Sequence, residues 1–367
     1  MKVSRITKNA LGTLTVAGIV TGLAASAAHA ADFSGKTISI IIPFKEGGGA
    51  DVYARIFQPF IAKHLPGKPN IIIRNMPGGG SIKGANYFEK TAKGDGLTVI
   101  CVSNSTMLGQ LFGGKKRKYD MTKWRPINVS AVGTVFYAVP GIGANGKDIA
   151  ADVKALQKQE LVFGAKSPIS GELRGFLAFD LLDMKIKPVF GMSRGGSRKA
   201  MMRKEFQIGY DNTAAYEQKV VKLIKKGQMV PLFTLGYPKA DGTIARDPEQ
   251  PDMPHVTEIY QKMNGGKMPS GHKWQALHNF MNLAVLASKG FSLPKGTSDD
   301  VYKTYISTMK KVIDDKEFRK KAGQLLGKYP QQFGDEAEQV YDRALNWKPE
   351  TMNWMKGWIK KNFNVNI

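Results

Sequence analysis

The sequence predicts an α/β protein of two lobes, joined by two crossings of the chain and separated by one cleft. One repeated pattern carries most of this prediction. A short apolar run is followed by a loop of small or polar residues, and then by apolar residues at helical spacing. In a parallel sheet such loops share the carboxyl edge, where open α/β folds bind their ligands. The chain is also long enough for two domains of ordinary size.

The first unit of this pattern is the clearest. Thr37–Ile42 is a β-branched apolar run that suits a strand buried on both faces. Gly47-Gly48-Gly49 follows as a loop, and Asp51 is predicted to be the N-cap of the next helix. A glycine loop that opens a helix aims backbone N–H groups and a positive helix end at one point, which favours an anion. A plain turn between strand and helix is the alternative.

Further units assign the rest of the chain to the two lobes. In the first lobe, strands at Pro69–Asn75 and Leu97–Val102 run into loops that end at Ser81 and Thr106. The crossing to the second lobe is placed near Ala131–Val139. Second-lobe strands are expected at 161–165, 187–190, 206–210 and 230–235, a long surface loop at 237–273, and the return strand at 282–287. The predicted boundaries are residues 31–135 and 280–367 for lobe 1, and 136–279 for lobe 2.

The N-terminus and the charge indicate an exported protein with anionic partners. Residues 1–30 have a basic start, an apolar run and Ala28-His29-Ala30, the pattern of a secretory signal peptide cleaved after Ala30, so a periplasmic location is expected. The formal net charge is +24, which favours small anions or an acidic partner surface. No nucleic-acid motif is present, and the four histidines after residue 30 lack the spacing of a metal site. Cys101, the single cysteine, is predicted to be a buried apolar residue.

Several short motifs also carry a family resemblance. They are Pro43-Phe44 with Gly47-Gly48-Gly49 and Asp51, Asn75-Met-Pro-Gly-Gly-Gly-Ser81 with Ala85-Asn-Tyr87, Gly94-Asp-Gly96, Arg194-Gly-Gly196, and Pro251-Asp-Met-Pro254 with Val256. The chain thereby resembles the Bug family of periplasmic solute-binding proteins, the receptors of tripartite tricarboxylate transporters. The resemblance covers nearly all of the chain after the signal, and Lys45-Glu46 departs from it, because the family usually has small residues or proline there. It implies a type II periplasmic-binding-protein fold, a hinge that closes on a ligand, a membrane transporter as partner, and no catalysis.

The binding hypothesis assigns a role to each loop. Backbone N–H groups of the glycine loops would hold a carboxylate, hydroxyl and amide groups after the third strand would add contacts, and the facing lobe would read the rest of the ligand. Arg194 is expected to pair with a second carboxylate, and Asp211 to accept from a ligand hydroxyl or amine or to serve as an N-cap. The predicted ligand-binding residues are Phe44, Gly47, Gly48, Gly49, Asp51, Gly79, Gly80, Ser81, Ser103, Asn104, Ser105, Thr106, Ser167, Ser170, Arg194 and Asp211. A monomer without cofactor or metal is expected.

Three other functions remain open. Gly191-Met-Ser193-Arg-Gly195 matches the nucleophile elbow of serine hydrolases, with Asp211 or Asp241 and His255 or His278 as partners. Gly141-Ile-Gly-Ala-Asn-Gly146 matches a dinucleotide-binding pattern, although Pro140 and export favour a loop. The protein is also compatible with a periplasmic sensor whose liganded form docks on a signalling kinase.

Overall fold

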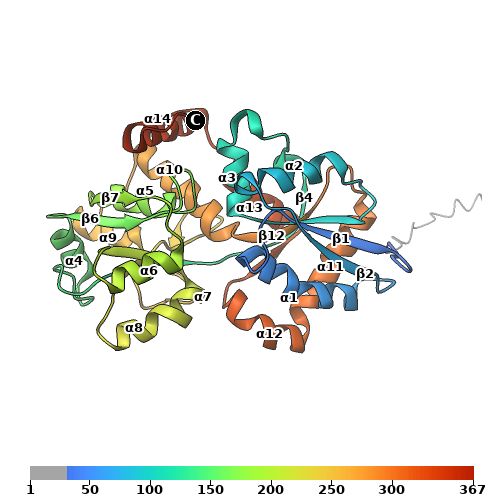
Figure 1. The fold of residues 1–367 in the computed structure, drawn as a ribbon, viewed down its shortest axis with the longest axis horizontal. Helices are drawn as coiled ribbons and strands as arrows, with labels where there is room; N and C mark the ends of the chain where they lie inside the picture. The colour runs from blue at the N-terminus through green and yellow to red at the C-terminus, as the bar shows by residue number, and fades with distance from the viewer. Residues whose placement is uncertain (1–30) are drawn as a thin grey trace, which may run out of the picture.

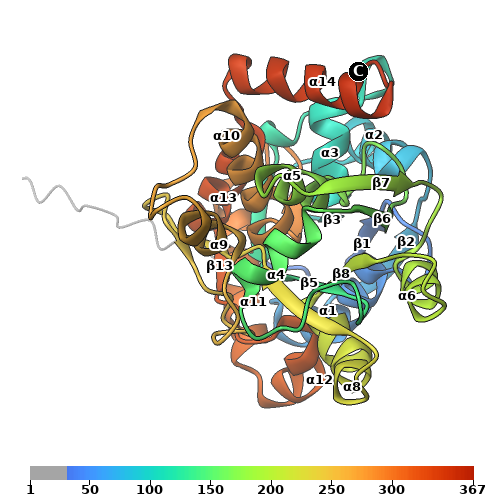
Figure 2. The ribbon, with the colours of Figure 1, turned by 90° about the vertical axis from the view of Figure 1, so that its left-hand side faces the viewer.

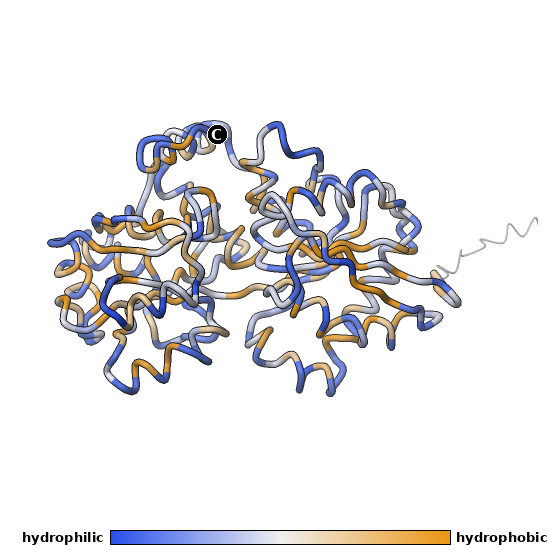
Figure 3. The backbone as a smooth tube through the Cα atoms, in the orientation of Figure 1, coloured by the Kyte–Doolittle hydropathy of each residue, from blue (hydrophilic) through white to orange (hydrophobic). Residues whose placement is uncertain are grey.

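The computed structural model describes residues 31–367, so the predicted signal peptide lies outside the described residues. Figure 1 shows two α/β lobes side by side, each built around its own sheet, and this confirms the predicted fold class. Apolar segments concentrate in the strands at the middle of each lobe (Figure 3). Within residues 31–367, no helix combines the length and apolar character needed to cross a membrane.

The first lobe is built on a six-stranded mixed sheet. Its strands, in spatial order, are β13 (Gln331–Phe333), β4 (Arg125–Ser130), β12 (Lys289–Leu293), β3 (Thr98–Ser103), β1 (Thr37–Ile42) and β2 (Asn70–Asn75). β1, β2 and β3 are parallel, and β12 runs antiparallel between β3 and β4. The first residue of β12 therefore lies at the edge of the sheet where β3 ends.

Helices cover both faces of this sheet because its strands are apolar on both faces. On one side Ile40 and Cys101 pack with α1 (Gly49–His64), α11 (Asp299–Asp314) and α12 (Lys316–Leu326). On the other side Ile41 and Ile100 pack with α2 (Ile82–Thr91), α3 (Asn104–Phe112) and α13 (Asp335–Leu345). Cys101 is fully buried, as predicted.

The second lobe is built on a five-stranded sheet. Its strands, in spatial order, are β7 (Lys185–Val189), β6 (Glu160–Gly164), β8 (Ile208–Asn212), β5 (Thr134–Ala138) and β9 (Val230–Thr234). Its helices are α4 (Ile149–Leu156), α5 (Leu173–Leu181), α6 (Arg194–Met202), α7 (Thr213–Ala215), α8 (Val221–Lys225), α9 (Val256–Met263) and α10 (Gly271–Met281). A π-helical segment, Tyr216–Val220, joins α7 to α8.

Two sequence-based predictions were wrong in this half of the chain. Residues 282–287 form no strand: α10 continues as a π-helical segment, Asn282–Leu286, and the return strand is β12. The run is apolar throughout because it is buried on all sides, and a short apolar run of this kind does not distinguish a strand from a buried helix. The predicted surface loop, 237–273, instead holds the hairpin of β10 (Tyr237–Pro238) and β11 (Ile244–Ala245), α9 and the start of α10.

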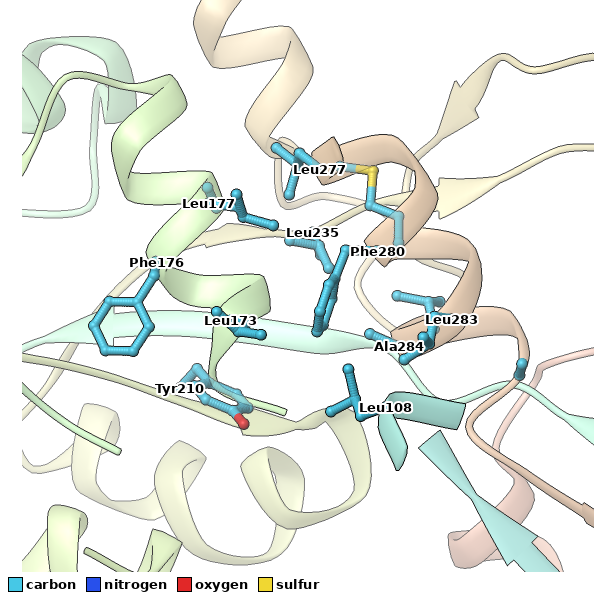
Figure 4. Close-up of a cluster of buried hydrophobic side chains, with 14 of the residues drawn as sticks. Leu108, Leu173, Phe176, Leu177, Tyr210, Leu235, Leu277, Phe280, Leu283 and Ala284 are labelled. Carbon is cyan, nitrogen blue, oxygen red and sulfur yellow. The ribbon is translucent and has the colours of Figure 1, made fainter. Parts of the chain in front are cut away.

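The lobes share one continuous apolar core. Figure 4 shows Leu108, from α3 of the first lobe, close to Ala284 and Leu283 of the π-helical segment and to Tyr210 of β8. The C-terminal helix α14 (Pro349–Phe363) then packs against α10 of the second lobe (Figures 1 and 2). Its end is fixed there, because the Phe363 ring packs at 4.9 Å from the Phe176 ring. The chain therefore passes from lobe to lobe at residues 131–133, at 287–288 and again before α14.

Candidate functional site

A cavity of about 390 Å³ lies between the two lobes. Its first-lobe wall comes from the loops that follow β1 and β2 and from α3. Its second-lobe wall is the loop that follows β6, from Lys166 to Ser170. The predicted binding residues that line it are Phe44, Gly79, Gly80, Ser81, Ser105, Ser167 and Ser170. The structure thus brings loops from both lobes to one space, as expected for the carboxyl edges of facing sheets.

Ser81 is the most unusual residue of this cavity. Its backbone has φ of +94°, in a region that L residues rarely adopt, and it follows three glycines that also have positive φ. Its side chain is only 2% exposed, and its Oγ has no hydrogen-bond partner among the described residues. A strained backbone next to a buried hydroxyl without a partner is typical of a functional site, and Ser81 lies in the cavity wall.

The first glycine loop lies outside the cavity lining and is shaped by Asp51. Gly48, rather than Asp51, is the N-cap of α1, so the predicted cap was wrong. The Asp51 carboxylate accepts from the Gly47 N–H at 2.9 Å and from Asn75 Nδ2 at 2.9 Å, and it pairs with Arg55. Burial raises the pKa of Asp51, but hydrogen bonds from Arg55 and Asn75 outweigh burial, and the net pKa is lowered. Asp51 therefore ties Gly47–Gly49 to the end of β2.

The residues after β3 divide into one cavity residue and three that build the start of α3. Ser103 is the N-cap, and its Oγ accepts from the Ser105 N–H at 3.3 Å. The Asn104 N–H donates to the Ser288 carbonyl at 3.1 Å, beside β12. Thr106 is buried, with an Oγ1 that has no partner among the described residues. Of the four, Ser105 alone reaches the cavity.

Arg194 is held by the protein itself. Its Nη2 lies 3.1 Å from Glu172 Oε1 and donates to the Gly164 carbonyl at 2.5 Å. Its guanidinium also lies 4.2 Å from the centre of the Tyr210 ring. Glu172 is 3% exposed. Burial raises the pKa of Glu172, but the charge of Arg194 and the hydroxyl of Ser170 lower it by more. The net pKa is therefore lowered, and the carboxylate stays ionised. The arginine expected to meet a ligand carboxylate thus already has a buried carboxylate as its partner.

Asp211 is engaged in the same way. Its carboxylate accepts from Arg198 Nη1 at 2.5 Å and from the Tyr137 hydroxyl at 2.8 Å, and its side chain is buried. The N-cap of α7 is Asn212, so the alternative role of Asp211 as a cap was wrong. Asp211 and Arg194 both lie outside the cavity lining.

Two cations at the interface between the lobes were missed by sequence reasoning. Lys289 begins β12, and Arg174 lies in the first turn of α5. Among residues 31–367, neither side chain pairs with a carboxylate. The available signal was a single charge within an otherwise apolar stretch, Leu-Arg-Gly-Phe-Leu-Ala-Phe for Arg174 and Lys-Gly-Phe-Ser-Leu for Lys289.

The alternative motifs have structural roles. Ser193 is the N-cap of α6, where its Oγ accepts from the Gly196 N–H at 3.1 Å. Within residues 31–367 no hydrogen bond joins Ser193 to a histidine, and His255 is occupied with Glu258. In the loop at 141–146, the N–H groups of Asn145 and Gly146 donate to the Asp152 carboxylate, so they are not directed at a pyrophosphate. No group of metal-ligating side chains suited to a metal ion is found among the residues that the structure describes.

Ser193→Ala is expected to lower the free energy of unfolding by about 1 kcal/mol, the usual contribution of an N-cap hydroxyl. It is expected to leave solute binding unchanged. Urea unfolding and binding calorimetry of the two proteins check both expectations. Hydrolysis of a chromogenic ester by the wild type that disappears in this variant would instead assign Ser193 a catalytic role.

Sequence comparison finds relatives over part of the chain. The chain is 34% identical over 133 residues to a UPF0065 protein of Bordetella pertussis, a match that covers 35% of this chain and 40% of that protein. It is 34% identical over 97 residues to Protein BugT of the same organism, covering 26% of this chain and 29% of BugT. The chain thus spans less than half the length of these curated relatives. No family model matches it.

Solved structures match over most of the chain. A TctC solute-binding protein from Polaromonas superposes with a TM-score of 0.64 at 18% identity, covering 89% of this chain and 98% of that one. MatC from Rhodopseudomonas palustris with bound malate gives 0.57 at 19% identity, covering 88% and 98%. An R. palustris protein with adipate gives 0.59 at 17% identity, covering 90% and 98%. At these identities the likeness shows a shared two-lobed binding-protein fold. Together with the named sequence relatives, it confirms that this chain resembles the Bug family of solute-binding proteins.

Proposed function

We propose that this protein captures an organic acid in the periplasm and delivers it to a membrane transporter of the tripartite tricarboxylate type. The cavity between the lobes is the observation that carries the proposal. Its walls combine a glycine loop, the unpartnered Ser81 hydroxyl and the Ser167–Ser170 loop, which suits a small polar ligand enclosed by both lobes. The positive net charge favours an anion, and two proteins of the same fold hold malate and adipate.

The remaining parts of the proposal follow from the same features. The protein binds its solute without converting it, since Ser193 acts as a helix cap and makes no hydrogen bond to a histidine within the described chain. A monomer remains the expected form. Residues 1–30 carry the export signal, and a tripartite transporter is the partner that the family resemblance implies. Closure of the lobes on the acid forms the surface that the transporter recognises.

A thermal-shift screen over mono-, di- and tricarboxylates and aromatic acids tests this function directly. A ligand at 100 times its dissociation constant stabilises the folded protein by about 2.7 kcal/mol, which raises the melting temperature by several degrees. At least one acid is expected to do so, and small-angle scattering should then report a more compact particle. A screen in which neutral sugars stabilise the protein and no acid does would contradict the proposal.

Ser81→Gly tests the cavity itself. We expect affinity for the acid to fall about 3- to 10-fold, the range for one neutral hydrogen bond. The free energy of unfolding should hold or rise, because glycine adopts φ of +94° without strain. Lys204→Gly is the matched control, since it relieves another residue with positive φ, outside the cavity lining. The control should leave affinity unchanged, and equal affinity in the wild type and Ser81→Gly would remove Ser81 from the site.

A further inference from the structure

The charged side chains in the wall of the cavity between the lobes are two lysines. Lys45 lines the cavity from the first lobe, in the loop that follows β1, and Lys166 lines it from the second lobe, in the loop that follows β6. Among residues 31–367, those that line this cavity include no aspartate, glutamate, histidine or arginine. Four other cavities of the described chain each have at least one acidic side chain in the lining. The general excess of positive charge therefore does not by itself produce a wall of this kind.

Both lysines stand on loops whose backbone is held by hydrogen bonds. The Lys45 carbonyl accepts from the Gly48 N–H at 3.3 Å, in the turn that leads into α1. The Lys166 carbonyl accepts from the Gly191 N–H at 3.0 Å, which ties it to the loop after β7. Both residues are exposed, and a lysine stem is flexible. Each ammonium is thus attached at a defined place on its wall and can turn toward a solute in the cavity.

Neither ammonium has a carboxylate of its own within the described protein. Among residues 31–367 neither Lys45 nor Lys166 makes an ion pair. Glu46, the next residue after Lys45, lies 3.8 Å from an arginine of α1. The charge of Lys166 helps to lower the pKa of Glu172, but Glu172 lies outside the cavity lining and has Arg194 at 3.1 Å. The protein therefore leaves both lysines to water or to a solute.

Much of the remaining wall is apolar. Side chains of both lobes contribute to it, namely Phe44, Ile82, Leu108, Phe112 and Ile169. A cavity that combines apolar side chains with a few charged groups suits a ligand with an apolar body and charged ends.

The balance of charge in the cavity indicates how many charges the solute carries. When the lobes enclose a solute, the groups in the wall lose water, and a charge that loses water without gaining a partner is costly. A solute with one carboxylate would leave one of the two ammonium groups unpaired. A solute with two carboxylates would leave none.

We propose that the solute is a dicarboxylate with an apolar spacer, and that its carboxylates pair one with Lys45 and the other with Lys166. This assignment rests on the proposed solute-binding function and adds to it the class of acid and the groups that recognise its charges. The pairing with a second carboxylate, which the sequence assigned to Arg194, thereby passes to Lys166. Because the two lysines belong to different lobes, one diacid bridges both lobes as they close.

Binding calorimetry of the wild type with succinate, glutarate, adipate and suberate, and with the monoamide of each, tests the number of charges. At least one diacid is expected to bind. Its monoamide should bind about tenfold more weakly or worse, the lower end for the loss of a hydrogen bond between charged groups. A monoamide that binds as tightly as its diacid would show that only one carboxylate is recognised, and would overturn the proposal.

Lys45→Met and Lys166→Met test the two lysines. Each variant keeps most of the stem, removes one charge, and should bind the diacid about tenfold more weakly or worse. The preference for the diacid over its monoamide should largely disappear in each variant, because only one lysine remains to meet a carboxylate. The melting temperature without solute should not change, since both side chains are exposed. A loss of affinity confined to one variant would overturn the pairing with two carboxylates.

Lys90→Met and Lys187→Met are the matched controls. Lys90 lies in α2 of the first lobe and Lys187 in β7 of the second, and both are exposed and outside the cavity lining. Each control removes the same charge from the general field, so losses equal to those of Lys45→Met and Lys166→Met would overturn the proposal.

The assignment and the binding function fail in different ways. If the wild type binds a diacid and both Lys45→Met and Lys166→Met bind it as tightly, the assignment fails and the binding function stands. The same holds if the wild type binds monocarboxylates and none of the diacids. A wild type that binds no acid of any class would overturn both.

Competitive labelling of amines in the wild type gives a readout that does not depend on a variant. A saturating diacid is expected to reduce acylation of Lys45 and Lys166, measured by mass spectrometry, because each ammonium is then enclosed and paired. Acylation of Lys90 and Lys187 should not change. Unchanged labelling of Lys45 or Lys166 at saturation would overturn the proposal.

Discussion

Arg194→Ala is expected to lower the free energy of unfolding by about 3–5 kcal/mol, the range for removing one partner of a buried ion pair. The variant leaves the Glu172 carboxylate 3% exposed, with only the hydroxyls of Ser170 and Tyr210 as donors from other side chains of the described residues. It also removes the guanidinium stacked on the Tyr210 ring at 4.2 Å. Urea unfolding at pH 7.5, followed by fluorescence, measures the loss.

Two further variants separate the buried pair from a general effect of charge. Arg203→Ala removes a surface pair with Glu205, whose side chains are both more than half exposed, and should cost less than about 1 kcal/mol. Adding Glu172→Gln to Arg194→Ala leaves no buried charge in this pair and should recover part of the loss. A loss below about 1 kcal/mol in Arg194→Ala alone would show that its guanidinium is free for a ligand, as the sequence first indicated.

Asp247→Asn is expected to remove about 2 kcal/mol of pH-dependent stability. Asp247 is fully buried beside the first crossing, where its Oδ1 accepts from the Tyr329 hydroxyl at 2.6 Å and its Oδ2 has no partner among the described residues. Burial raises the pKa of Asp247 to about 6, and the nearby Glu249 carboxylate contributes in the same direction.

The sign of this effect follows from proton linkage. The folded protein binds the proton of Asp247 more tightly than the unfolded chain, whose aspartates titrate near 3.8. The contribution of Asp247 therefore favours the folded state at low pH and is lost as the pH rises through 6. As the pH falls from about 7.5 to 4.5, the unfolding free energy of the wild type should rise by about 2 kcal/mol relative to that of Asp247→Asn. The difference between the two unfolding free energies at each pH measures this gain. Parallel pH profiles for the two proteins would contradict the assigned pKa.

The sequence identified loops that line the cavity between the lobes, but it did not predict the pairings of the charged side chains. Strand, loop and helix recur with local signals, so the sequence alone predicts the glycine loop before Ser81 and the Ser167–Ser170 loop, both of which line the cavity. The partner of Arg194 is Glu172, on a different element, and nothing local marks that pairing. Arg174 makes no ion pair among residues 31–367, and its place in an otherwise apolar helix gave no local sign of this. Charge pairing between distant elements decides which arginines are already paired, and a single sequence does not contain that information.

The wrong prediction of a strand at 282–287 and the failure to predict β12 also arose from features of the whole fold. The run at 282–287 is uniformly apolar because it is enclosed by both lobes, so its periodicity was lost. β12 is harder to recognise because it begins with Lys289 and Gly290, which weaken a strand pattern. Gly290 is required there, since a Cβ at that position would lie 2.2 Å from the Asn128 carbonyl oxygen of β4. The features that obscured this strand are the ones that place Lys289 at the sheet edge and let β4 approach.

The position of β12 between β3 and β4 has a consequence during synthesis. β3 and β4 are translated early, but the strand that must lie between them begins only at Lys289, long after β4 ends at Ser130. At synthesis rates of roughly 5–20 residues per second, that delay is on the order of ten seconds. Until β12 arrives, the nascent first lobe has an unfilled gap in its sheet, and stable folding is postponed. Under the proposed export, a secretion machinery that threads unfolded polypeptide would therefore meet a chain that has not yet folded stably.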